Sequence, residues 1–165
     1  MSSGPYIGQR VSQRTLNHAK STVLEPNEEL VCVIHGQIDH SKSGELLVTN
    51  RRVLFYFPTI FSGYQYFLFP YDQITDVNAI SRFISDKLEL AVGSKRILLD
   101  AVGKGDGRVA AQIILDMKDH VSRLKAQPSQ VDVADQIERL GKLREKGLIT
   151  EEDFVRKKDE LLERL

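Results

Sequence analysis

The stretch ELLVTNRRVLFYFP, residues 45–58, decides the fold of this chain. It contains two runs that are rich in Leu, Val and Phe, and such residues favour the extended backbone of a β-strand. The four residues Thr49–Arg52 that join the runs are polar, and Asn50 among them can adopt the positive φ of a tight turn. We therefore expect a β-hairpin that turns at Asn50.

Five further strand-like runs flank this hairpin. One precedes it and four follow it, over residues 29–38, 64–70, 73–80, 87–93 and 95–100. Seven short strands at close spacing, with no helical pattern between them, predict an antiparallel meander that closes into a small barrel or packs as two sheets. Cys32, the only cysteine, lies in the first run and is expected to be buried, and it excludes an intrachain disulfide.

After the last strand, the apolar residues change from a period of 2 to a period of 3.6. One helical face over residues 105–125 is apolar, at Val109, Ile113, Met117, Val121 and Leu124. This pattern predicts a single amphipathic helix, with Asp106 as its N-cap. At the other end of the chain we expect residues 1–9 to be disordered and residues 10–23 to form a short helix.

The stretch LREKGLITEEDF, residues 143–154, predicts the end of one helix and the start of another. Gly147 can adopt the left-handed conformation that ends a helix in a Schellman motif. Thr150 then serves as the N-cap of the next helix, with Asp153 at the third position of a capping box. Ile149 and Phe154 occupy the positions of a hydrophobic staple. We expect two antiparallel helices, over residues 134–146 and 151–164.

Both arms of this expected hairpin carry an apolar stripe. The apolar residues are Ile137, Leu140 and Leu143 on the first arm, and Phe154, Leu161, Leu162 and Leu165 on the second. A hairpin of about 30 residues rarely buries enough surface to fold alone. We therefore expect its stripes to be covered by the rest of the chain, by a second copy or by another protein.

The composition excludes several classes of protein. Lys and Arg together number 23, as do Asp and Glu, so no net charge attracts nucleic acid or an anionic membrane. The first 20 residues contain no apolar segment of a signal peptide, and no stretch has the roughly 18 apolar residues of a membrane span. The expected location is the cytoplasm, with the inner membrane face as the site of a peripheral, lipid-bound alternative.

The sequence contains no catalytic or metal-binding constellation. The four histidines lie in separate contexts, and none belongs to an H-E-x-x-H motif. GKGDG, residues 103–107, lacks the spacing of a phosphate-binding loop, and its Asp106 would repel a phosphate. We expect no catalytic residues, no metal, no cofactor and no small-molecule substrate, and therefore a protein that is not an enzyme.

The aromatic residues are unevenly distributed. Nine of the 12 Phe and Tyr residues lie between Phe55 and Tyr71. Most can fill the core, but Ile60, Phe61 and Tyr64 fall in the expected loop between two strands. Apolar side chains on a loop indicate a surface that is covered by a partner subunit, by a membrane or by the protein's own C-terminal hairpin. This loop is a candidate interaction site, and with Arg51 and Arg52 it is a candidate lipid-binding wedge.

The C-terminal region resembles a known family, the SHOCT or short C-terminal domain. The resemblance covers residues 135–165 and rests on Ile137, Leu140, Leu143, Gly147, Ile149, Thr150, Asp153, Phe154, Lys157, Lys158, Leu161 and Leu162. Asp153 departs from the family pattern, in which Glu is more usual at that position.

The region before it is similar to the bacterial pleckstrin-homology-like (PH-like) domains. The similar stretches are LEPNEELVCVIHG, GELLVTNRRVLFY and FPYDQITDVN. The resemblance implies an α+β fold, in which a seven-stranded, bent β-barrel is capped by a C-terminal helix. With the two-helix hairpin, the expected organisation is an N-terminal tail (1–23), a PH-like domain (24–125), a linker (126–133) and a SHOCT hairpin (134–165).

The resemblances imply a protein that binds other proteins. Bacterial PH-like and SHOCT domains are associated with oligomerisation, so the expected function is assembly, with a homo-oligomer or a protein partner. Many eukaryotic PH domains bind phosphoinositides through a basic first loop, but here that loop holds Lys42 beside Asp39. The alternatives are a peripheral lipid-binding protein and, with only Arg10, Arg14 and Lys20 to favour it, an accessory protein that binds nucleic acid.

Overall fold

The computed structural model of the chain describes residues 4–61, 63–126 and 130–163. The chain forms two compact units, residues 1–122 and residues 123–165. The first unit contains all the strands and the second contains the helical hairpin. Both units together confirm the expected mixed α+β class, a strand region with PH-like features followed by a C-terminal pair of helices.

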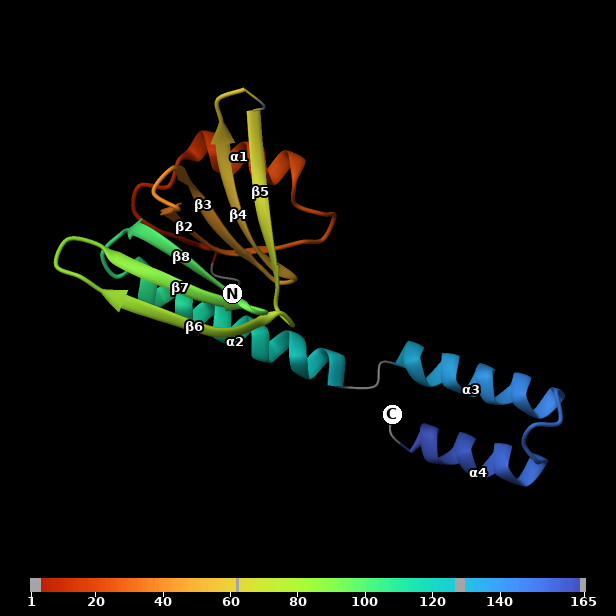
Figure 1. The fold of residues 1–165 in the computed structure, drawn as a ribbon. Coiled ribbons are helices and arrows are strands. Elements are labelled where there is room, and N and C mark those ends of the chain that lie inside the picture. Colours follow the sequence, from red (N-terminus) through yellow and green to blue (C-terminus); the bar gives the residue numbers. More distant parts are fainter. Residues whose placement is uncertain (1–3, 62, 127–129, 164–165) are drawn as a thin grey trace. The chain divides into compact units, whose positions relative to one another are not determined.

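One sheet contains all eight strands (Figure 1). Its strands are β1 (Tyr6–Ile7), β2 (Leu30–Ile38), β3 (Lys42–Thr49), β4 (Arg52–Thr59), β5 (Gly63–Pro70), β6 (Ile74–Ser81), β7 (Asp86–Val92) and β8 (Lys95–Val102). The order is β5-β4-β3-β2-β8-β7-β6, with every neighbouring pair antiparallel, and β1 pairs in parallel with β2. The seven expected strands are therefore all present.

Among the described strands, the sheet is not closed into the barrel that the resemblance to PH-like domains implies. Within the described residues, β5 and β6 are the two ends of the strand order. The three residues that join them form successive turns, in which Gln73 N–H donates to Pro70 O (3.0 Å) and Ile74 N–H donates to Tyr71 O (3.3 Å). Two successive bonds of this kind form a short helix-like turn, and Figure 1 shows β5 and β6 leaving this bend in different directions.

The N-terminal segment is ordered from Gly4 onward, so the prediction of disorder over residues 1–9 is wrong for its described part. Tyr6 and Ile7 pair with Cys32 and Val33 of β2, and Gly8 N–H donates to Val33 O (2.8 Å). The carboxylate of Asp106 accepts hydrogen bonds from the Tyr6 hydroxyl (2.8 Å) and from Gln9 N–H (2.7 Å). Residues 1–3 lie outside the described residues.

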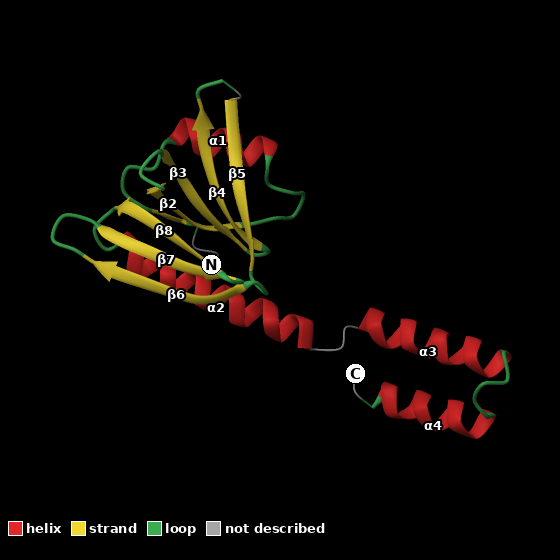
Figure 2. Cartoon of the chain, viewed as in Figure 1, coloured by secondary structure: helices red, strands yellow, loops and turns green. Residues whose placement is uncertain are grey.

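Strands β3 and β4 are buried on both faces, because α1 covers one face (Figure 2) and the main core covers the other. Helix α1 (Gln13–Thr22) packs Leu16 and Ala19 onto one face, against Val33, Leu47, Leu54 and Tyr56. The other face of these strands lines the main core, which includes Phe55, Leu46, Leu88 and Leu90. Burial on both faces explains why residues 53–57 are apolar without alternation.

Helix α2 (Asp106–Ala126) confirms the expected helix, but its most buried residues differ from the predicted ones. Ala110 and Ile114 are fully buried in the main core, and Ile113, Met117 and Val121 pack at its edge. The two fully buried positions are each one residue after a predicted one, Val109 and Ile113. Asp106 is not the N-cap that we expected, because it lies in the first helical turn and binds the N-terminal segment.

The turn between β3 and β4 also differs from its prediction. Asn50 does not adopt a positive φ. Thr49 Oγ1 instead accepts hydrogen bonds from the N–H groups of Arg51 (3.1 Å) and Arg52 (3.0 Å). The Asn50 side chain accepts a bond from Glu29 N–H (3.0 Å) and so ties the turn to the chain before β2.

The C-terminal unit contains the helical hairpin, formed by α3 (Gln130–Glu145) and α4 (Glu151–Leu162). Gly147 has φ +68°, and the predicted Schellman bonds are present from Gly147 N–H to Arg144 O (2.8 Å) and from Leu148 N–H to Leu143 O (2.9 Å). Thr150 caps α4 by accepting from Asp153 N–H (3.1 Å), as expected. Helix α3 begins earlier than predicted, and residues 127–129 of the expected linker lie outside the described residues.

Candidate interaction surfaces

The turn between β4 and β5 carries two fully exposed apolar side chains. Ile60 is 92% exposed and Phe61 is 99% exposed. The strands end at Thr59 and begin again at Gly63, so these side chains lie at the tip of the hairpin. The structure therefore places two of the three predicted loop residues in solvent.

Tyr64, the third, lies inside β5 and not in the loop. Its ring stacks on the imidazole of His18 (centroids 4.3 Å apart) and on the ring of Tyr56 (5.1 Å). His18 comes from α1, and its Nδ1 is 2.5 Å from the Tyr56 hydroxyl. Tyr64 thus helps to hold α1 on the sheet, and the helix half-covers it.

Arg51 and Arg52 do not lie near the exposed tip, because they occupy the opposite end of β4. At about 3.3 Å per residue, the eight residues of this strand separate them from Ile60 by roughly 25 Å. Arg51 pairs with Glu25 (3.0 Å), and Arg52 forms a bidentate pair with the buried carboxylate of Glu28 (2.8 and 2.9 Å). The structure does not bring the predicted wedge together.

The Glu28–Arg52 pair is part of the core. Burial favours a higher pKa for Glu28, but the hydrogen bonds from Arg52, from the Glu25 backbone and from the Thr49 hydroxyl outweigh it, and the pKa is lowered. Glu28 also accepts from Thr49 Oγ1 (2.7 Å). Arg52 is therefore committed to a structural ion pair and is not available to a lipid phosphate.

The turn between β6 and β7 forms a second exposed apolar tip, which sequence reasoning missed. Phe83 is 98% exposed and Ile84 is 82% exposed. Below the tip, the Lys104 ammonium donates to Ser81 Oγ (2.8 Å) and to the Arg82 carbonyl. The signal in the sequence is an apolar pair between Arg82 and Ser85 at a strand connection, where polar turn residues are the rule.

The outer edge of β5 is a third candidate surface. Tyr66, Phe67 and Leu68 are each partly exposed there, although all three are large and apolar. Beside them lies an open groove of about 730 Å³, lined on one side by Tyr66–Phe69 and on the other by Gln73 and Val92–Leu98. The whole strand, GYQYFLFP, contains no charged residue.

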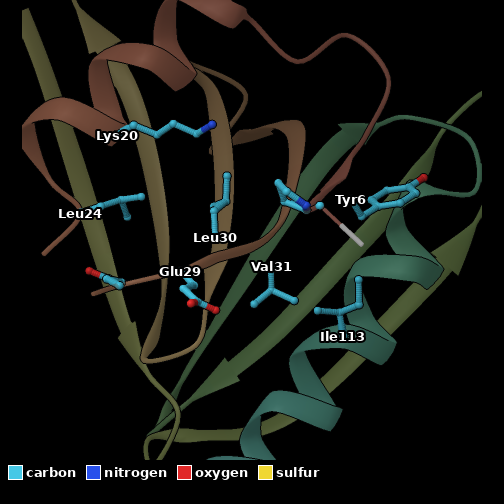
Figure 3. Close-up of a pocket in the computed structure, with 10 residues that line it drawn as sticks. Tyr6, Lys20, Leu24, Glu29, Leu30, Val31 and Ile113 are labelled. Carbon is cyan, nitrogen blue, oxygen red and sulfur yellow. The ribbon is translucent and has the colours of Figure 1, made fainter. Parts of the chain in front are cut away.

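A pocket of about 710 Å³ lies between α1, the N-terminal segment, β2 and α2 (Figure 3). Figure 3 shows its apolar side chains, Leu24, Leu30, Val31 and Ile113, with Lys20 of α1 at the rim. The Tyr6 hydroxyl bonds to Asp106, which with burial raises the pKa of Tyr6 to about 12. The polar groups of Tyr6 and Glu28 are thus engaged in structural contacts.

The sheet also holds a buried carboxylate that the sequence analysis did not single out. Glu45 of β3 accepts from the N–H of Ser12 (3.0 Å), the N-cap of α1. His35 Nδ1 forms a hydrogen bond of 3.5 Å with Glu45 Oε1 and lies 3.3 Å from Oε2, which itself has no hydrogen-bond partner. Because Glu45 is linked to the start of α1, its role is to position that helix.

The groove between α3 and α4 is the fourth candidate surface, with a volume of about 320 Å³. Leu140, Leu143 and Leu161 line it, between the charged residues Arg139, Lys157 and Glu160. Of residues 134–163, whose side chains the structure describes, only Leu161 is buried. Leu143 and Leu162 are exposed, and Ile137 is half-buried.

Phe154 lies at the start of α4, where a cation covers it. The Arg144 guanidinium carbon is 4.7 Å from the centre of the Phe154 ring, and Arg144 also pairs with Glu151 (3.3 Å). These contacts join the end of α3 to the start of α4 across the turn. Of the predicted hairpin residues, Leu140, Leu143 and Leu161 thus line the groove, and Leu143 and Leu162 are exposed. Leu165 lies outside the described residues.

Several other predicted features have plain positions in the structure. Arg14 and Lys20 are exposed on α1, and Arg10 precedes it. Lys42 pairs with Asp39 (3.1 Å) in the turn before β3.

Among the described residues, no group of three His, Cys, Asp or Glu side chains could hold a metal ion, and no helix is long and apolar enough to cross a membrane.

Two of three comparisons with known proteins find similar ones. The family model of the bacterial PH domain matches residues 24–116, and that of the short C-terminal domain matches residues 135–162. A comparison with functionally curated proteins gives no match.

Solved structures with a similar fold share little sequence with this chain. A protein with a pleckstrin-homology domain from Shewanella loihica is 21% identical, covers 66% of this chain and 98% of its own, and has a TM-score of 0.45. The pleckstrin-homology domain from Shewanella amazonensis is also 21% identical (59% and 88% covered, TM-score 0.41). The C-terminal domain of an unknown protein from Leishmania infantum is 15% identical (64% and 92% covered, TM-score 0.45).

The family match rests on more than half of the residues and covers β2 to β8 and the first half of α2. The second match covers most of α3 and all of α4. Both kinds of domain are typical of proteins without catalytic activity. The chain belongs to the bacterial PH domain family and carries a short C-terminal domain after its PH domain.

Proposed function

We propose that this protein is a non-enzymatic assembly module, in which the PH-like domain is a scaffold and the helical hairpin mediates oligomerisation. The observation that carries the proposal is the state of the hairpin's apolar stripes. Only Leu161 is buried among residues 134–163, while Leu143 and Leu162 remain exposed beside the groove.

A two-helix unit with so little buried surface needs a further apolar contact to be stable. Burying an apolar side chain of this size contributes about 1.5–3 kcal/mol, and the loss of conformational entropy on folding opposes this gain at about 1–2 kcal/mol per residue. A second protein surface on the hairpin supplies the missing burial. The charged residues Arg139, Lys157 and Glu160 at the rim of the groove would then lie around an apolar centre, as in many protein interfaces.

The test is the mass of the full chain in solution. We expect light scattering after size exclusion to give an oligomer for the unmodified chain and a smaller species for L143E/L162E, because each new carboxylate would be buried without a partner. The matched control is Asp159→Lys, which also changes one exposed side chain of α4 but removes no apolar contact. Equal masses for all three proteins would contradict the proposal.

A peripheral lipid-binding protein is the second candidate, and the two exposed tips favour it. Phe61 and Phe83 are almost fully exposed, and an aromatic side chain can insert into the interfacial region of a bilayer. Co-sedimentation with vesicles of mixed neutral and anionic lipids tests this candidate. Binding that persists in F61D/F83D would exclude the tips as the lipid contact.

A further inference from the structure

The free edge of β5 is unlike the other free edge of the sheet. Strand β6 contains Asp76 and a register irregularity between Ile74 and Asp76, and both features discourage pairing with another strand. Strand β5 pairs with β4 along all eight of its residues without an irregularity, and it has no charged residue and no internal proline. The backbone of such a long and regular edge can pair with an extended segment of another chain.

The groove beside this edge has an apolar side and a cationic side. On the side of β5, Phe67 packs on Phe57 (ring centroids 5.2 Å apart), and Phe69 is buried in the main core. On the other side, the start of β8 supplies Lys95 and Arg96. An extended segment that pairs with β5 would therefore enter a groove that offers it both apolar contacts and positive charge.

Lys95 supplies the positive charge that remains available in this groove. Arg96 pairs with Glu89 (2.5 Å), and Asp39, which also lines the groove, pairs with Lys42 (3.1 Å). Lys95 is exposed, and none of the carboxylates that the structure describes forms an ion pair with it. An acidic residue on the incoming segment would supply this missing partner.

We propose that the edge of β5 and this groove bind an extended segment of another protein, in which apolar residues alternate and an acidic residue pairs with Lys95. The segment would continue the sheet beyond β5, and its alternate side chains would lie beside Phe67 and Phe69. A second copy of β5 fits less well, because its sequence, GYQYFLFP, contains no acidic residue for Lys95. The charge in the groove therefore favours a different protein over a second copy.

This inference goes beyond the proposed function of the hairpin. All the residues that it uses lie in the unit that comprises residues 1–122, and none lies in α3 or α4. The variant L143E/L162E, which removes the hairpin contact, should therefore bind the segment as tightly as the unmodified chain does. The two proposals can thus fail independently of each other.

The first test identifies the preferred segment. The probe is a phage-displayed library of random peptides of about ten residues, the length of a long strand, selected against the full chain. We expect the enriched peptides to have alternating apolar residues, mainly β-branched or aromatic, and at least one Asp or Glu. A selection that yields no binder, or only binders without an acidic residue, would overturn the proposal.

The second test exchanges charge between the groove and the selected peptide. Fluorescence anisotropy of the labelled peptide should show that Lys95→Glu weakens binding about tenfold, and that a peptide with Lys in place of its acidic residue binds this variant tightly again. Arg108→Glu is the matched control, because Arg108 is an exposed cation of α2 that does not line the groove. Equal effects of the two substitutions, or no recovery with the exchanged peptide, would contradict the proposal.

The third test detects pairing of the two backbones. A strand directs every second N–H group toward the neighbour with which it pairs. N-methylation of the peptide should therefore weaken binding strongly at alternate residues and only slightly at the residues between them. A similar effect at every residue would mean that the peptide does not extend the sheet, and the proposal would be wrong.

Sedimentation of L143E/L162E decides between a different protein and a second copy. We expect this variant to be a monomer that binds the selected peptide with the affinity of the unmodified chain. A dimer that the peptide dissociates would assign the edge of β5 to a second copy and would overturn the proposal.

Discussion

At the scale of single residues, Asp106 joins two segments that are about 100 positions apart in the chain. Its carboxylate accepts from the Tyr6 hydroxyl and from Gln9 N–H, and it is itself buried. This contact orders a segment that the sequence predicts to be disordered. Sequence reasoning could not find it, because nothing near Tyr6 or near Asp106 indicates that the other residue is its partner.

We predict that Tyr6→Phe lowers the free energy of unfolding by about 1 kcal/mol at pH 8, the usual effect of removing one hydrogen bond. In the folded protein, the Asp106 hydrogen bond and burial raise the pKa of Tyr6 from its ordinary 10 to about 12. The unfolded chain therefore loses this proton at a lower pH than the folded chain does. The contribution of Tyr6 is complete below about pH 10 and disappears as the pH rises to about 12.

Urea unfolding at several pH values between 8 and 11.5 measures both effects. The unmodified protein should lose more stability over this range than Tyr6→Phe does. Burial also raises the pKa values of Cys32 and Tyr71, so both proteins should show a shared background loss. The same pH dependence in the two proteins would show that the Tyr6 contact is not formed.

The predicted lipid-binding wedge does not form in the structure, because two of its residues, Arg52 and Tyr64, contact other parts of the fold. Arg52 and Tyr64 lie in the two strands that flank the exposed loop, so the sequence alone groups both residues with Phe61. In the fold, Tyr64 meets His18 from α1, and Arg52 meets Glu28 at the far end of β4. Partners distant in sequence decide the role of each residue, and these partners were not visible from the local pattern.

At the scale of elements, the turn between α3 and α4 was predicted almost completely. Its stop at Gly147 and its cap at Thr150 depend on residues within a few positions of each other. The strands were also predicted, because β-branched and aromatic runs identify them. The gap between β5 and β6 was not predicted, because it depends on how the chain bends at residues 71–73 and on the path of β6.

We predict opposite effects of the same substitution at two glycines of the hairpin. Gly147 has φ +68°, and Gly147→Ala should destabilise the hairpin by about 1–2 kcal/mol because a Cβ is strained in that conformation. Gly141 lies within α3, and Gly141→Ala should stabilise it by about 0.5–1 kcal/mol. A Cβ built at either position meets no atom within 4 Å, so no steric clash complicates the comparison.

Amide hydrogen exchange of the α3 and α4 segments, read by mass spectrometry, measures the stability of this unit within the full chain. Exchange should be faster in Gly147→Ala and slower in Gly141→Ala than in the unmodified protein. Effects of the same sign at both positions would mean that the left-handed conformation at Gly147 does not control the hairpin.

At the scale of the whole molecule, the chain combines a PH-like domain with a short C-terminal domain, and each unit leaves apolar surface uncovered. The hairpin exposes Leu143 and Leu162, and the sheet exposes the edge of β5 with the Phe61 tip. A chain with balanced charge has no overall repulsion that would keep its copies apart.

The mass of the unmodified 165-residue chain, measured by sedimentation equilibrium over a wide range of concentration, tests the proposed assembly most directly. We predict a mass of at least twice the 18.7 kDa of one chain, reduced by L143E/L162E. A mass of 18.7 kDa for the unmodified chain at every concentration would contradict the proposed assembly function.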